Sequence, residues 1–273
     1  MSIQNSQKNK IEIIPALLPE SFSHLENEIN IVRKAITSKY IQIDVVDGMF
    51  ASTRTWPYNR RDSEVWDNLI KGEIGLPFWD QANFEIDLMV MDQVGEAIKW
   101  IMAGASRLIG HIESFDKNFT NEMTLEKYTE IASDPNYKAD LDTDELEKFF
   151  KLRDDFNVEI VMSLNPATKN ETLDSIIDRL DGVQFMGNDR IGYHGVSLDE
   201  AVLEKVKKLR QLKPIFPIGI DIGVNFKTLE KLAEAGVTRF SSGSTILKSE
   251  NPKKTIQDMF GVLVEAGFIE SNN

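Results

Sequence analysis

The chain has 273 residues, of which 41% are hydrophobic, and this is enough for one domain with a substantial core. It contains no cysteine, which excludes disulfides, thiolate nucleophiles and cysteine-based metal sites. The formal charge of -13 opposes a nucleic-acid partner, and no apolar run approaches the roughly 18 residues of a membrane helix. We therefore expect a cytoplasmic protein that binds neither nucleic acid nor membrane.

Apolar runs of strand length recur along the whole chain after a polar start. Residues 1–10 lack any period and are expected to form a flexible tail, followed by a single domain over 11–273. Eight strands are predicted by the apolar runs. In chain order they cover residues 11–18, 40–49, 84–89, 106–112, 158–164, 182–186, 215–220 and 237–244, the last including a turn.

Helical patterns separate these strands. The predicted helices cover residues 21–35, 63–71, 92–103, 124–132, 143–156, 170–180, 198–212, 225–235 and 252–266. Ser21 is the predicted N-cap of the first helix, and Gly104 is the predicted C-cap of the third. Strand and helix thus alternate about eight times, which predicts an α/β protein with a (β/α)8 barrel rather than an open doubly wound sheet. No Gly-x-Gly-x-x-Gly follows the first strand, which argues against dinucleotide binding.

Acidic residues stand at or near the ends of three predicted strands. They are Asp44, Asp87 and Asp221, and in a parallel barrel the carboxyl ends of the strands converge on one mouth. Asp44 and Asp221 come from strands 2 and 7, so a bound sugar could lie between them. Two such carboxylates can remove a proton from one face of a carbon and return one to the other, which is what an epimerase requires. Asp47 precedes a glycine and is interpreted as a turn residue.

Glycines follow strands 6, 7 and 8, where barrels of this kind often bind phosphate with backbone N–H groups. The candidate phosphate-binding residues are Gly192, Gly195, Gly223, Gly243 and Ser244. His194 lies in the first of these loops and is a candidate for contact with a phosphate or a sugar hydroxyl. His111, at the end of strand 4, is interpreted as a core histidine.

Several of these segments together resemble a known family, ribulose-phosphate 3-epimerase. The resemblance rests on Pro15-Ala16-Leu17-Leu18, Gln42-Ile43-Asp44-Val45-Val46-Asp47-Gly48-Met49-Phe50, Asp87-Leu88-Met89-Val90, Leu164-Asn165-Pro166-Ala167-Thr168, Gly192-Tyr193-His194-Gly195, Asp221-Ile222-Gly223-Val224-Asn225 and Gly243-Ser244. It extends over about residues 11–252, with expansions near 52–83 and 115–157. It implies a TIM barrel of the ribulose-phosphate-binding type that acts on a phosphorylated sugar.

The resemblance also implies site residues. In the family, two aspartates at the positions of Asp44 and Asp221 act as acid and base, and a divalent metal is bound with the help of two histidines. Gln42 and Asp87 stand where those histidines are expected, and Ala16 replaces a serine. Asp44, Asp87 and Asp221 are the candidate ligands here, and such oxygen donors favour Mg²⁺, Mn²⁺ or Ca²⁺, or no ion at all.

Three functions remain open on the sequence. The first is an isomerase that epimerises a phosphorylated ketose with Asp44 and Asp221. The second is a non-catalytic sugar-phosphate-binding protein derived from the family, which the replaced histidines favour. The third, an aldolase or decarboxylase on the same scaffold, ranks last because no lysine stands out at a strand end. The family resemblance also suggests a homo-oligomer.

Overall fold

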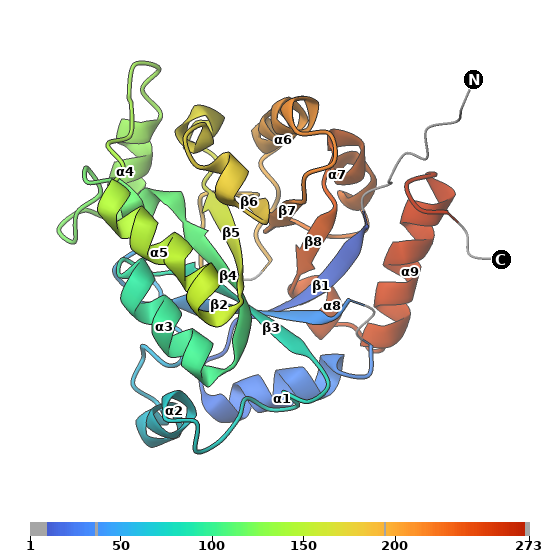
Figure 1. The fold of residues 1–273 in the computed structure, drawn as a ribbon. Coiled ribbons are helices and arrows are strands. Elements are labelled where there is room, and N and C mark those ends of the chain that lie inside the picture. Colours follow the sequence, from blue (N-terminus) through green and yellow to red (C-terminus); the bar gives the residue numbers. More distant parts are fainter. Residues whose placement is uncertain (1–9, 36–37, 194, 271–273) are drawn as a thin grey trace.

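The computed structural model describes residues 10–35, 38–193 and 195–270, and in it eight parallel strands close into a barrel (Figure 1). Each strand pairs with the next along the chain, and β1 pairs with β8. The strands are β1 (Glu12–Leu17), β2 (Tyr40–Val46), β3 (Asn83–Met89), β4 (Ala105–His111), β5 (Glu159–Leu164), β6 (Gly182–Met186), β7 (Ile218–Asp221) and β8 (Arg239–Ser242). The predicted (β/α)8 barrel is confirmed.

Helices surround the barrel and cover its outer face (Figure 1). They are α1 (Phe22–Val32), α2 (Ser63–Ile70), α3 (Gln93–Ala103), α4 (Leu125–Ala132), α5 (Thr143–Phe156), α6 (Ala201–Leu212), α7 (Leu229–Ala235), α8 (Ser244–Leu247) and α9 (Pro252–Glu265), with short 3-10 turns η1 (Ile112–Phe115), η2 (Asn170–Leu173) and η3 (Ile177–Arg179). Within the described ranges, no helix has both the length and the apolar character needed to span a membrane.

Local capping chemistry explains several of the boundaries. Ser21 accepts a hydrogen bond from the backbone N–H of His24 and caps α1, and Asp92 accepts one from Gly95 at the start of α3. Gly104 ends α3 with a φ of +113°, a conformation that favours glycine. Both predicted caps, Ser21 and Gly104, are confirmed.

One predicted helix is wrong. Residues 170–180 form only the two turns η2 and η3, although Leu173, Ile176 and Leu180 are buried as a helix pattern requires. The backbone bonds here run from residue i+3 to residue i, as from Ile176 N–H to Leu173 C=O. Apolar side chains spaced by three and four residues can therefore be buried by 3-10 turns as well as by an α-helix.

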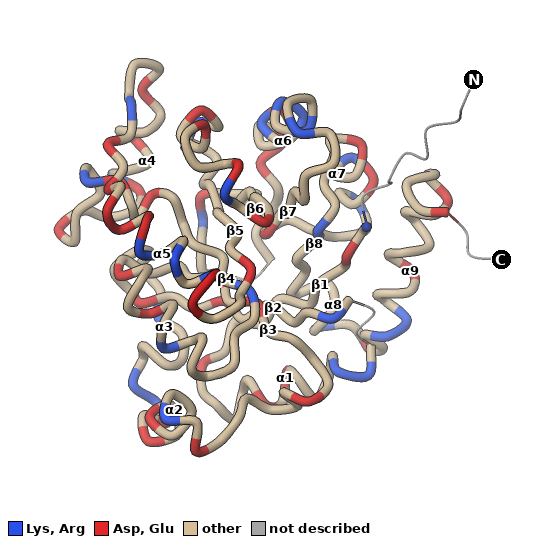
Figure 2. The backbone as a smooth tube through the Cα atoms, in the orientation of Figure 1, with Lys and Arg blue, Asp and Glu red and all other residues tan. Residues whose placement is uncertain are grey.

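The two expansions pack on different parts of the barrel: the first lies against α3, and the second also packs on the last residues of β2, β3 and β6 through a buried apolar cluster. In the first, Trp56 is fully buried, and its ring lies 5.5 Å from that of Trp66 and 5.9 Å from that of Trp100 on α3. The second contains α4 and α5, where acidic side chains are frequent (Figure 2). Asp116 is buried there and accepts hydrogen bonds from the hydroxyls of Tyr128 and Tyr137.

Charged side chains and one tyrosine gather at the amino end of the barrel, and Arg107 and Glu85 among them are buried. We call this group the floor network: Arg107, Glu85, Glu159, Arg239 and Tyr40. The Arg107 side chain is 2% exposed and forms ion pairs with Glu85 and Glu159. Its guanidinium lies 3.6 Å from the centre of the Tyr40 ring. Arg239 lies 3.6 Å from Glu159. Each charge here has an opposite charge beside it.

Candidate active site at the carboxyl ends of the strands

Three aspartates meet at the carboxyl end of the barrel, and we call them the acid cluster: Asp44 on β2, Asp87 on β3 and Asp221 at the end of β7. Asp44 and Asp87 are register partners on neighbouring strands. One carboxylate oxygen from each of the three residues lies within 4.8 Å of the others. All three side chains are buried. The structure thus brings together the three acids that the sequence singles out.

Neutral amides contact two of these carboxylates. The amide nitrogen of Gln42 donates to Asp44 at 2.7 Å, while its amide oxygen accepts from the Ser241 hydroxyl at 2.6 Å. Gln42 therefore presents its N–H, not its oxygen, to the acid cluster. Gln184 on β6 donates to Asp87 at 3.0 Å.

His111, at the end of β4, contacts Asp87 directly. Its Nε2 lies 2.8 Å from Asp87 Oδ1, and both side chains have no exposed surface. The interpretation of His111 as a buried core residue is correct, but its place beside the acid cluster was missed. Its position at the end of the strand next to β3 was the available signal, because alternate residues of neighbouring strands point into one barrel interior.

Burial and mutual repulsion disfavour the charged forms of the acids. Burial, followed by the nearby charges of Asp221 and Asp87, raises the pKa of Asp44 well above its ordinary value. Burial and then Asp87 raise the pKa of Asp221 to about 7, although the N–H of Ile222 and the charge of His111 oppose the rise. Burial opposes the charge of His111, but attraction to Asp87 and Glu113 outweighs it and raises the pKa of the imidazole. The cluster is therefore able to hold protons near neutral pH.

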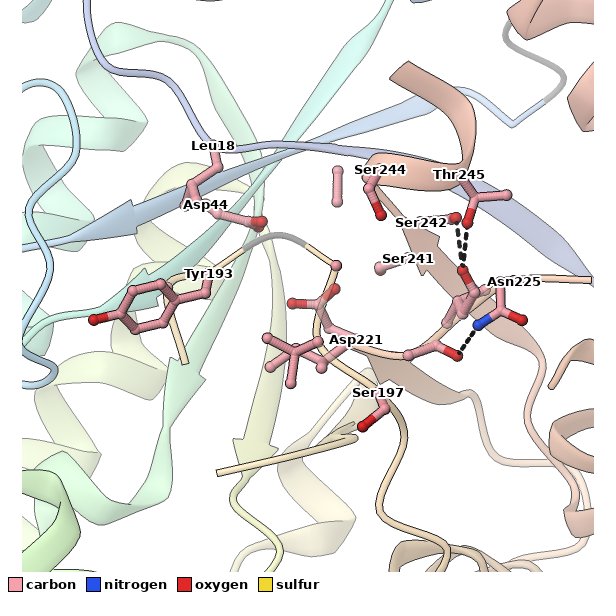
Figure 3. Close-up of a pocket in the computed structure, with 18 of the residues that line it drawn as sticks. Leu18, Asp44, Tyr193, Ser197, Asp221, Asn225, Ser241, Ser242, Ser244 and Thr245 are labelled. Carbon is pink, nitrogen blue, oxygen red and sulfur yellow. Dashed lines mark hydrogen bonds between the residues drawn. The ribbon is translucent and has the colours of Figure 1, made fainter. Parts of the chain in front are cut away.

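A cavity of about 350 Å³ opens beside Asp44 and Asp221. Figure 3 shows these two side chains entering it from different strands. The loops after β6, β7 and β8 form most of its wall, including the predicted Gly192, Gly195, Gly223, Gly243 and Ser244, and Ala16, Leu18 and Met89 also line it. His194 lies outside the described residues. None of the described residues that line the cavity is a lysine or an arginine, so its polar donors are backbone N–H groups and uncharged side chains such as Ser197 and Asn225.

Two of these glycines are required by the space around them. Gly223 has a φ of +82°, and a Cβ there would lie 2.7 Å from the backbone of Leu198. Gly192 has a φ of +80°, and a Cβ there would lie 2.2 Å from Thr53 Oγ1. At both positions a side chain is disfavoured for two reasons, because φ is positive and because another part of the chain lies too close. Ile222, between Asp221 and Gly223, has a φ of +71°, a rare conformation for a β-branched residue that often marks functional sites.

The loop after β7 is held from behind by hydroxyl and amide groups (Figure 3). Ser242 and Thr245 each donate to the carbonyl of Val224 at 3.1 Å. The Asn225 side chain donates to the carbonyl of Gly223 at 3.1 Å. These bonds fix the backbone that borders the cavity. Asp47, in contrast, accepts from the backbone N–H groups of Met49, Phe50 and Met91, which confirms its structural role.

The acid cluster fits a divalent ion held by one oxygen from each aspartate. Three buried carboxylates that repel one another are stabilised by a cation, and an all-oxygen donor set suits Mg²⁺, Mn²⁺ or Ca²⁺. Gln42 does not add a fourth oxygen, because its carbonyl faces Ser241.

An acid cluster and a glycine-lined cavity at the carboxyl mouth of a (β/α)8 barrel define the class of barrel proteins whose sites are built from the strand-end loops. A sequence model of the Ribulose-phosphate 3 epimerase family matches residues 120–247. The chain is 24% identical over 255 residues to ribulose-phosphate 3-epimerase of Schizosaccharomyces pombe, covering 93% of this chain and 95% of that protein. The Bacillus subtilis enzyme of the same name is 24% identical over 256 residues, covering 92% and 99%.

Solved structures share the fold at lower sequence identity. KGPDC from Streptococcus mutans superposes with a TM-score of 0.61 at 14% identity, covering 95% of this chain and 100% of that one. A 3-hexulose-6-phosphate synthase gives 0.59 at 14%, covering 92% and 99%. Over most of its length the chain is therefore similar to ribulose-phosphate 3-epimerases. It departs from them at two positions, since Gln42 and Asp87 stand where the resemblance leads us to expect histidines.

Proposed function

We propose that this protein epimerises a phosphorylated ketose, with Asp44 and Asp221 as the acid and base. The observation that carries the proposal is that two buried carboxylates from different strands border one cavity of about 350 Å³, with a third acid behind them. Similarity to ribulose-phosphate 3-epimerases supports the same reaction. Ribulose 5-phosphate is the first substrate to test.

The proposed reaction is a proton exchange at the carbon next to the ketone. One aspartate, ionised, removes the proton from one face, and the electron pair of the C–H bond moves into the enediolate. The other aspartate, protonated, returns its proton to the opposite face, and the configuration inverts. One acid must therefore be charged while the other is neutral. The raised pKa values of Asp44 and Asp221 support such a shared state near neutral pH.

The phosphate is proposed to rest against the loops after β6, β7 and β8. The residues assigned to it are Gly192, Gly195, Gly223, Gly243 and Ser244, with His194 assigned to the phosphate or a sugar hydroxyl. Glycines let the backbone approach the ligand closely, so that N–H groups replace cationic side chains as donors. The absence of Lys and Arg among the described lining residues supports this mode of binding.

A divalent ion is proposed to be held by Asp44, Asp87 and Asp221. When bound, such an ion stabilises negative charge on the oxygens of the enediolate. The protein's own contribution is to keep the three carboxylates within reach of one another and away from water. Gln42 holds Asp44 through its N–H and is itself held by Ser241.

A non-catalytic sugar-phosphate-binding protein is the second candidate. The observation that favours it is the way the replaced positions are used: Gln42 turns its oxygen away from the acid cluster, and both oxygens of Asp87 accept hydrogen bonds. Such a protein would keep the glycine loops and bind a sugar phosphate without exchanging its hydrogen with solvent.

The test is exchange of the C3 hydrogen of ribulose 5-phosphate in deuterium oxide, followed by NMR with and without Mn²⁺ or Mg²⁺. Epimerisation requires exchange, and Asp44→Asn or Asp221→Asn should lower turnover by about 10²- to 10⁴-fold. The matched control is Asp67→Asn on the exposed side of α2, which should leave turnover unchanged. Undiminished turnover in Asp44→Asn would rule out its assigned role. Binding without any exchange would establish the second candidate.

A further inference from the structure

The carboxylate of Asp87 is held on both sides. Oδ1 lies 2.8 Å from His111 Nε2, and Oδ2 accepts from Gln184 Nε2 at 3.0 Å. The two partners come from β4 and β6, and both are buried. The terminal torsion of an aspartate is soft and broad. Because a donor contacts each oxygen, this torsion is fixed at Asp87.

His111 is itself held in place by its surroundings. The Phe50 ring packs against the imidazole, with ring centres 4.7 Å apart. Glu113 Oε2 lies 3.8 Å from Nδ1, too far for a hydrogen bond. Among the described residues, neither of these two atoms has a hydrogen-bond partner. Nε2 is therefore the nitrogen of His111 that bonds a neighbour, and that neighbour is Asp87.

Glu113 ties this arrangement to the next loop. Its Oε1 accepts from the N–H of Asn165 at 2.8 Å and from the hydroxyl of Thr168. Both residues belong to the loop after β5. His111 thus adjoins a buried aromatic ring and a carboxylate that the next loop holds, and both restrict its movement away from Asp87.

Fixing matters at Asp87 because its neighbours are also acids. Asp44 is its register partner, and Asp221 completes the acid cluster within 4.8 Å. An unrestrained carboxylate would turn away from the other two charges. Each oxygen of Asp87 accepts one hydrogen bond and keeps a lone pair for a second contact, so both remain able to face an ion or a substrate.

We propose that His111 and Gln184 are positioning residues, which hold the carboxylate of Asp87 in its orientation toward Asp44 and Asp221. Hydrogen bonds to a metal-binding or substrate-binding carboxylate commonly set its orientation in this way. The inference rests on the proposed function in one respect, namely that the acid cluster acts on an ion or a substrate. The hydrogen bonds themselves are tested independently of turnover.

The first experiment compares variants that keep or remove the donor. In His111→Gln the amide nitrogen takes about the place of Nε2, whereas His111→Leu and Gln184→Met offer no donor. We expect His111→Leu and Gln184→Met to weaken Mn²⁺ binding, measured by calorimetry, by about 10- to 100-fold. In both variants kcat should fall, while KM should stay within about twofold of the wild-type value. His111→Gln should stay within about threefold of the wild type, as should His24→Gln on α1.

The second experiment observes the bond directly. The chain has three histidines, so ¹⁵N-histidine labelling gives a simple spectrum in which His111→Gln identifies the signals of His111. We expect Nε2 to carry a slowly exchanging proton and its resonance to change in Asp87→Asn.

The outcomes separate the two proposals. An Nε2 without a proton, or a His111 signal unaffected by Asp87→Asn, would overturn the positioning role. So would an equal weakening of Mn²⁺ binding in His111→Gln and His111→Leu when both variants are folded. If the wild type turns over no ketose phosphate while the NMR signature is present, the proposed function fails and the orientation of Asp87 by His111 stands.

Discussion

The two ends of this barrel bury charge in opposite ways. At the amino end, Arg107 is paired with Glu85 and Glu159. At the carboxyl end, no lysine or arginine of the described ranges forms an ion pair with Asp44, Asp87 or Asp221.

A single strand supplies both ends, because Glu85 and Asp87 are two residues apart on β3. Paired charges at the amino end of a barrel stabilise the fold, whereas like charges left together at the mouth are suited to chemistry.

The largest expected effect is a loss of stability when the floor network is disrupted. Arg107→Met leaves the buried carboxylate of Glu85 without its partner, and breaking a buried pair costs about 3–5 kcal/mol of unfolding free energy. Urea denaturation measures this loss. The matched control is Arg61→Met, which removes an exposed pair with Glu20 and should cost less than about 1 kcal/mol. Equal costs in the two variants would contradict the assignment of the floor network to stability.

At the mouth, removing a charge should instead stabilise the protein. The pKa of Asp221 is raised by burial to about 7 from an ordinary 3.8. The stability linked to this group is therefore fully present below about pH 4 and is lost as the pH rises through 7. At pH 8 without metal ions, Asp221→Asn should be more stable than the wild type by up to about 4 kcal/mol.

Urea denaturation at pH 4 and pH 8 measures this effect. The gain should disappear at pH 4, where the wild-type carboxyl is protonated. Asp67→Asn, at an exposed position, provides the control and should show no such dependence on pH. The opposite result would be a variant that loses stability relative to the wild type when the pH rises from 4 to 8. It would show that neighbouring groups stabilise the charge of Asp221 in the folded protein.

A divalent ion bound to the acid cluster should supply the positive charge that the arginines supply in the floor network. At about 100 times its dissociation constant, a bound ion adds about 2.7 kcal/mol to the unfolding free energy. For a chain of this size that raises Tm by roughly 5–10 °C, measured by calorimetry at pH 8 with Mn²⁺ or Mg²⁺. Asp87→Asn should remove most of the increase. No increase in the wild type would speak against a metal in the acid cluster.

The glycine loops at the mouth should show a smaller effect. Gly223→Ala places a Cβ 2.7 Å from the backbone of Leu198 and should cost about 1–3 kcal/mol from crowding alone. Gly267 has the same φ of +82° but open space around it, so Gly267→Ala should cost only the conformational strain of about 1 kcal/mol. Denaturation midpoints of the two variants isolate the contribution of close approach. Equal midpoints would show that the loop after β7 moves to accommodate the added Cβ at no cost in stability.

Much of the fold follows from local sequence signals. All eight strands were predicted, and β6 has the predicted bounds, because Val183, Phe185 and Met186 form a short apolar segment bounded by glycines. Boundaries were less certain where loops carry apolar residues. The strand predicted to begin at Ile215 begins at Ile218, and Ile215 is 67% exposed.

The candidate site was predicted less completely than the fold. The convergence of Asp44, Asp87 and Asp221 follows from barrel topology once each acid is placed at a strand end. Which way Gln42 turns its amide does not follow, because that depends on Ser241, a residue 199 positions away in the chain. The contact between His111 and Asp87 likewise depends on the register of β3 with β4. Such contacts are set by tertiary packing rather than by local pattern.

The closure of β1 onto β8 has a consequence for self-association. A closed barrel has no edge strand, so the sheet offers no free row of backbone groups to which another chain could add. Any contact between copies of this protein therefore falls to the outer helices and loops. Exposed apolar side chains are present there, among them Trp79 in the first expansion and Met102 on α3, which are 69% and 51% exposed. Association through such side chains would leave the barrel's own hydrogen bonds intact.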